Sequence, residues 1–130
     1  MAFNIHAVDK KAQKSGVWTA FEGSEFLIAS TSSSAYQKRV AVLRKPLAKQ
    51  IDKGTVDPDD LINMLCTALS EHILLDWKGV EGDKNVEIDY TQYRGLEAMK
   101  DNDDFREFVS DFGSTQANYE QEFKDEVVKK

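Results

Sequence analysis

The longest apolar pattern in the chain lies between Asp57 and Val80, and it predicts a central helix over 57–77. Asp57 can cap this helix, and Pro58 is tolerated at a first helical position. Leucine, isoleucine, methionine and alanine residues then recur at helical spacing and cover more than one face. A helix that is apolar on several faces is surrounded by other elements. We therefore expect it to lie at the centre of the core, with Gly79 as its stop.

Aromatic and β-branched residues predict an N-terminal β-hairpin over 17–30, with Gly23 and Ser24 between its strands. Two strands alone are marginally stable in water, so this hairpin must pack on helices. The preceding residues, 1–15, are expected to form an N-terminal arm, because nothing in their sequence fixes their position.

Apolar residues at helical spacing predict four more helices besides the central one. The first has a basic outer face and is interrupted by Pro46, which should kink or restart it. The four helices lie at about 34–53, 91–100, 103–112 and 114–128. The predicted fold class is therefore mainly α: one small helical domain over 16–130 with a short N-terminal β-hairpin packed on the helices.

The chain has 130 residues and a net charge of -6, which argues against general affinity for nucleic acid. The charge is unevenly distributed along the chain. Residues 1–54 carry nine basic and four acidic side chains, a balance of +5, whereas residues 55–130 carry eight basic and nineteen acidic ones, a balance of -11. Such a dipolar chain could associate with copies of itself, or the two halves could simply be solvated faces.

The sequence shows no segment that marks secretion or membrane insertion. The first fourteen residues lack the apolar stretch of a signal peptide, and no apolar run approaches the ~20 residues that span a bilayer. A single cysteine, Cys66, allows no intramolecular disulfide. We therefore expect the protein in a reducing compartment, without contact with a membrane.

No pattern of reactive residues predicts catalysis or a metal site. Cys66 and His72 are six residues apart and lie on different faces of the central helix. The acidic segment 83–89 resembles a calcium loop, but Ile88 stands at the position of its glycine and Arg94 at that of its final glutamate. Phosphate-binding loops and nucleophile elbows are absent from the sequence. We expect no catalytic residue, no metal and no cofactor.

Partner-binding candidates are aromatic residues and a basic helix face. Trp77 follows an apolar helix end, where it either closes the core or anchors a partner. Two aromatic stripes near the C-terminus either contact a partner or another copy, or belong to the core. The candidates are Trp77, Phe105, Phe108, Phe112, Tyr119 and Phe123, together with Lys38, Arg39, Arg44 and Lys45 on the basic helix.

The order of these pieces resembles the tail assembly chaperone family of long-tailed, siphovirus-type bacteriophages. The resemblance covers most of the chain from Val17 to Phe123. It rests on the aromatic hairpin, the basic helix with its proline, the Leu-Leu-Asp-Trp-Lys-Gly segment at 74–79 and the Tyr-Thr helix start at 90–91. The loop 81–85 departs from the pattern, because it lacks the extra glycine and proline of many relatives.

The resemblance implies a non-catalytic protein of the host cytoplasm that is absent from the mature virion. Such proteins bind the tape measure protein, keep it soluble and recruit tail tube protein, in many cases through a frameshifted longer form. Self-association is also expected. The alternatives are a structural tail-completion or connector component of the virion, and an acidic inhibitor of a DNA-binding protein. Neither a nucleic-acid nor a membrane partner is expected.

Overall fold

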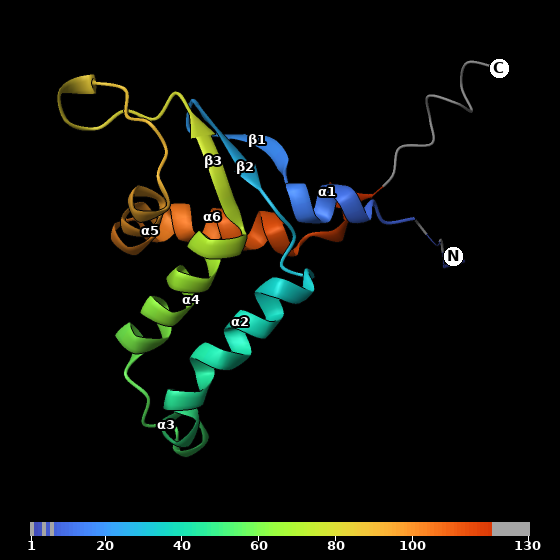
Figure 1. The fold of residues 1–130 in the computed structure, drawn as a ribbon, viewed down its shortest axis with the longest axis vertical. Helices are drawn as coiled ribbons and strands as arrows, with labels where there is room; N and C mark the ends of the chain where they lie inside the picture. The colour runs from blue at the N-terminus through green and yellow to red at the C-terminus, as the bar shows by residue number, and fades with distance from the viewer. Residues whose placement is uncertain (1, 4, 6, 121–130) are drawn as a thin grey trace.

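The structure, a computed structural model, describes residues 2–3, 5 and 7–120. Six α-helices and the strands of a three-stranded sheet follow one another in these residues (Figure 1). The elements are α1 (Lys10–Ser15), β1 (Val17–Phe21), β2 (Ser24–Ile28), α2 (Ser34–Arg44), η1 (Lys45–Leu47), α3 (Ala48–Lys53), α4 (Pro58–His72), β3 (Leu74–Lys78), η2 (Asp83–Asn85), α5 (Gln92–Asp101), α6 (Asp103–Ser114) and η3 (Gln116–Tyr119).

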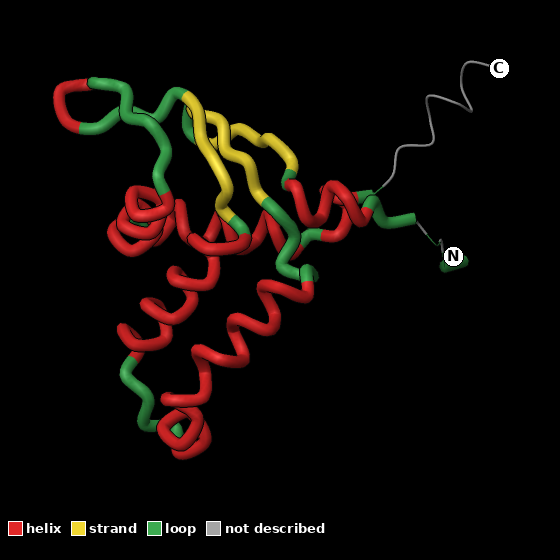
Figure 2. Tube along the Cα trace, in the orientation of Figure 1, coloured by secondary structure: helices red, strands yellow, loops and turns green. Residues whose placement is uncertain are grey.

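The predicted fold class, mainly α with a two-stranded hairpin, is wrong, because the sheet has three strands. The strand order is β1-β2-β3 and both pairings are antiparallel, so β2 is the central strand (Figure 2). The two strands of the predicted hairpin are present, with Val17 opposite Ile28 and Phe21 opposite Ser24. The fold is therefore a helical assembly built around an antiparallel sheet.

The third strand arises from residues that were expected to end the central helix, so the predicted helix 57–77 is too long. The helix α4 ends at His72, and the N–H of Ile73 donates to the carbonyl of Leu69 in its last turn. Residues Leu74–Lys78 then pair with β2. Leucine and tryptophan fit a pleated, half-buried surface, and the free edge of β2 supplies backbone partners that a longer helix would have left unpaired.

The core lies between the sheet and the helices α4, α5 and α6. Buried residues of α4 are confined to its C-terminal half, where Cys66, Ala68 and Leu69 are fully enclosed. The apolar side of α6 packs near β2 and supplies Phe105 and Val109 to the same core. The C-terminal half of α4 therefore lies in the core, as predicted, and its N-terminal half does not.

The helices α2, α3 and α4 extend away from the sheet as one projection, which we call the helical projection (Figure 1). The predicted helix 34–53 is divided into α2, η1 and α3, because Pro46 lies at the start of the 3-10 turn. Gly54 ends α3 with φ 69°, a left-handed conformation that glycine adopts without steric cost.

The two ends of the described chain meet at the sheet. The predicted arm 1–15 contains the short helix α1, whose N-cap Asp9 accepts from the N–H of Ala12. The Asp9 N–H donates to the carbonyl of Tyr119 over 2.7 Å. The predicted last helix, 114–128, begins instead with the 3-10 turn η3, and its part beyond Glu120 lies outside the described residues. None of the described helices is long and apolar enough to cross a membrane.

Candidate functional site

Most of the predicted aromatic contact residues lie inside the folded chain. Trp77, Phe105 and Tyr119 are buried, with 5%, 7% and 1% of their surfaces exposed. Phe108 and Phe112 are half-buried and pack against the core. Stacked and tilted contacts join Phe108 to Phe21 at 4.5 Å between ring centroids and to Phe112 at 6.1 Å. These side chains therefore hold α6 to the sheet, and Phe123 lies outside the described residues.

Trp77 fixes the loop that follows β3. Its indole Nε1–H donates to the carbonyl of Ile88 over 2.9 Å, and its ring meets that of Tyr90 edge-on at 5.1 Å. The Tyr90 hydroxyl donates to the carbonyl of Leu74 over 2.8 Å. Burial, followed by the charge of Asp76, raises the pKa of Tyr90 to about 12. Trp77 is therefore a structural residue of the folded chain rather than an exposed anchor.

Tyr119 joins the C-terminal turn to the sheet. Its hydroxyl donates to the carbonyl of Ile28 over 2.9 Å, and burial raises the pKa of the phenol. The ring also contacts Phe112 edge-on at 6.0 Å. The second predicted aromatic stripe, as far as it lies in the described residues, is thus part of the core.

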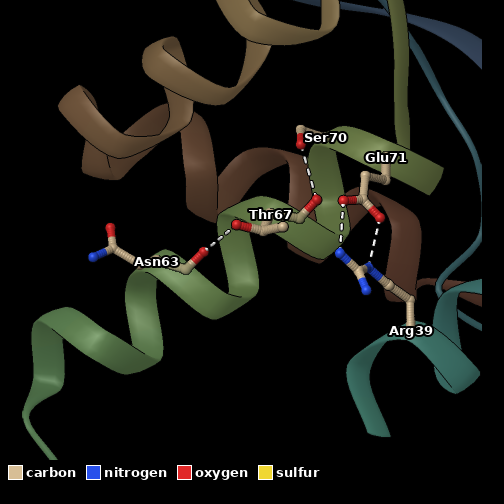
Figure 3. A network of polar contacts seen from close by, with 5 residues as sticks. All are labelled: Arg39, Asn63, Thr67, Ser70 and Glu71. Carbon is tan, nitrogen blue, oxygen red and sulfur yellow. Dashed lines mark hydrogen bonds and ion pairs between the residues drawn. The ribbon is translucent and has the colours of Figure 1, made fainter. Parts of the chain in front are cut away.

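The predicted basic face is accessible. Lys38, Arg44 and Lys45 are exposed, whereas Arg39 is half-buried and turned toward α4. The Arg39 guanidinium makes a two-point contact with the carboxylate of Glu71, with N–O distances of 2.7 and 3.2 Å (Figure 3). The ion pair between Arg39 and Glu71 therefore joins α2 to the C-terminal end of α4. Lys38, Arg44 and Lys45 remain available to a partner.

The polar groups next to this ion pair belong to α4 itself. The Thr67 hydroxyl donates to the carbonyl of Asn63, and the Ser70 hydroxyl donates to the carbonyl of Thr67, each over 2.8 Å (Figure 3). Side-chain bonds of this kind satisfy hydroxyls inside a helix and create no binding site. Within the described residues, no group of three or more metal-ligating side chains occurs.

The part of the helical projection farther from the sheet carries a set of apolar residues that lie outside the core, which sequence reasoning missed. It consists of five half-buried residues from η1, α3, α4 and the loop before α4, and we call it the tip cluster: Leu47, Ile51, Val56, Leu61 and Met64. No residue of α3, nor any of the first half of α4, is buried. Helical spacing predicts an apolar side for both helices, but it cannot show that this part of each helix extends beyond the core.

A second candidate surface is an open groove at the opposite end of the sheet, with a volume of about 980 Å³. The segments that line it come from the β1–β2 turn, the end of β3, and the junction of α5 and α6. Apolar and acidic side chains both line it, and we call it the acidic groove. We use floor for its buried and half-buried apolar residues and rim for its exposed acidic ones. The floor contains Phe21, Phe26, Trp77, Val80 and Phe105, and the rim contains Glu22, Glu81, Asp101, Asp103 and Asp104.

The charge of the acidic groove is largely uncompensated. Asp103 forms an ion pair with Arg106 over 2.7 Å, and within residues 7–120 no other rim carboxylate has a cationic partner within ion-pair distance. The residues that line the groove include no lysine or arginine. The groove therefore combines apolar side chains with an excess of negative charge, which favours a cationic ligand with an apolar anchor.

The comparisons with known proteins place this chain in a phage-related family. The model of the family described as "YdaY prophage protein" matches residues 31–130, which is most of the chain. No curated protein and no solved structure matches it. The matched region includes the helical projection, β3 and the α5–α6 side of the acidic groove. The chain belongs to the YdaY prophage protein family.

Proposed function

We propose that this protein is a tail assembly chaperone that binds the tape measure protein of its phage, keeps it soluble and helps to recruit tail tube subunits. Membership of a prophage protein family supports a role in the life cycle of a phage. The resemblance of the sequence to tail assembly chaperones supports this particular role. Neither line of support requires catalytic chemistry.

The tip cluster is the observation that carries the proposal. Its five apolar side chains are half-buried on the elements of the helical projection, and none of them belongs to the main core or packs against it. Long amphipathic helices expose apolar stripes that aggregate unless another surface covers them. A grouped, partly exposed apolar surface on a helix pair fits such a stripe, in the manner of a helix bound in a groove.

Charged residues around the tip cluster suit reversible binding. Lys49 and Lys53 of α3 and Asp57, Asp59 and Asp60 at the start of α4 are all exposed. Charges of both signs keep the surface soluble and complement the mixed polar face of an amphipathic helix. Apolar contacts supply the affinity, so a single introduced carboxylate in the cluster should weaken binding strongly.

The test is co-expression with the tape measure protein encoded by the same prophage. Ile51→Asp and Val56→Asp place a negative charge in the tip cluster. Val86→Asp is the matched control, because Val86 is 60% exposed in the loop between β3 and α5. Thermal melts establish that all three variants are folded. We expect the soluble fraction of the tape measure protein to fall to its level without chaperone for the two tip variants only. Unchanged solubility with folded tip variants would contradict the proposed contact surface.

A second measurement separates the chaperone from a connector component of the virion. Mass spectrometry of purified phage particles should detect tape measure and tube proteins but not this chain. Its presence at a fixed copy number in the particles would refute the chaperone assignment.

A further inference from the structure

We propose that the acidic groove of one copy binds the basic face of α2 of a second copy, so that copies associate head to tail. This inference concerns a surface that the proposed function does not use. The basic face is defined by Lys38, Val42 and Lys45.

These three residues lie on one side of α2 and of the residue that follows it. Lys45 keeps a helical conformation after the end of α2, so their spacing of four and three positions places them along one helix face, and all three are exposed. Val42 has 51% of its surface exposed and lies between two lysines. The opposite side of α2 carries Tyr36 and Val40, which pack against the core. Internal packing therefore does not explain the apolar residue at position 42.

The groove is complementary to this face in charge and in apolarity. Its rim is acidic and its floor is apolar, so an exposed valine flanked by lysines matches both features. Asp101 is the last residue of α5, where the negative end of the helix dipole disfavours a carboxylate. Its charge thus does not serve the stability of α5, which is consistent with a role in the groove.

The two surfaces of one copy cannot meet. The strand β2 runs from the turn that lines the groove toward the segment leading into α2, so the groove and α2 lie at opposite ends of the sheet (Figure 1). A contact between two different surface patches is heterologous, and it produces rings or open chains of copies rather than a closed pair. Association through exposed charge weakens as salt screens it.

The test is a charge exchange between the two surfaces, followed by sedimentation velocity in about 50 mM and about 500 mM salt. One variant carries Lys38→Glu and Lys45→Glu on the basic face. A second carries Glu81→Lys and Asp101→Lys on the groove. The matched controls are Lys10→Glu with Lys11→Glu on α1, and Glu107→Lys with Asp111→Lys on α6, which change the same charges at exposed positions elsewhere.

We expect the wild-type chain and both controls to associate at low salt and to dissociate at high salt. Each surface variant alone should weaken association at least ~10-fold, and so should Val42→Asp. An equimolar mixture of the two surface variants should associate again, because opposite charges then face each other in every contact. A monomeric wild type at low salt would overturn the proposal. Undiminished association of either surface variant, or a mixture that stays monomeric, would overturn it equally.

Discussion

Replacing Tyr119 by phenylalanine tests whether the C-terminal turn is part of the core. The hydroxyl donates to the Ile28 carbonyl over 2.9 Å, and the side chain is 1% exposed, so water cannot replace the lost donor. Leaving a buried acceptor without its partner costs about 1–3 kcal/mol in free energy of unfolding. For a chain of 130 residues, such a loss lowers the Tm by roughly 3–12 °C.

The assay is urea unfolding followed by circular dichroism at neutral pH. Tyr93→Phe is the matched control, because it removes the same hydroxyl from a side chain that is 70% exposed, and it should change stability by less than ~0.5 kcal/mol. If Tyr119→Phe shifts the unfolding midpoint no more than the control does, the hydroxyl contact does not stabilise the fold. The assignment of Tyr119 to the core by this bond would then be refuted.

Three further predictions concern residues that pack around the sheet. Leu69→Ala should lower the free energy of unfolding, measured in urea, by about 2–5 kcal/mol, because Leu69 is fully buried. Leu65→Ala should cost less, because Leu65 is only half-buried. Equal effects would mean that the assignment of buried residues in α4 is wrong. Gly95→Ala should cost about 1–3 kcal/mol in a thermal melt, because the new Cβ would lie 2.9 Å from Tyr90 Cε1, whereas Gly82→Ala, with its nearest neighbour at 3.5 Å, should cost less. The pKa of Tyr90 is raised to about 12 from its ordinary value of 10.0, so the buried neutral phenol stabilises the folded chain below pH 10, and this contribution should disappear as the pH rises toward 12. Tyr90→Phe should make the fall in the free energy of unfolding in urea less steep over that pH range, and an unchanged slope would contradict this.

Local pattern predicted the elements whose residues favour one structure. The two hairpin strands are rich in aromatic and β-branched residues, and the segments of α5 and α6 show helical spacing with acidic or threonine starts. The strand β3 was missed, because Leu74 and Leu75 continue the apolar run of α4 equally well as helix. Only the free edge of β2, which is a tertiary feature, decides in favour of a strand.

Candidate surfaces were harder to predict than elements. An aromatic stripe at helical spacing looks the same whether it faces a core or a partner, and Phe105 proved to face the core. The acidic groove joins the β1–β2 turn, the end of β3 and the α5–α6 junction, which are far apart in the sequence. Nothing in local spacing brings Glu22 near Asp101, so only the folded structure reveals a common site.

Hydrogen exchange of the chain with and without its co-purified tape measure protein tests the central claim most directly. If the tip cluster covers a helix of the tape measure protein, backbone amides between Lys45 and Met64 should exchange more slowly in the complex. Amides of the central strand β2, already protected by the sheet, should change little. Slower exchange only in the sheet and in α5 and α6, with unchanged exchange in the helical projection, would contradict the proposed function.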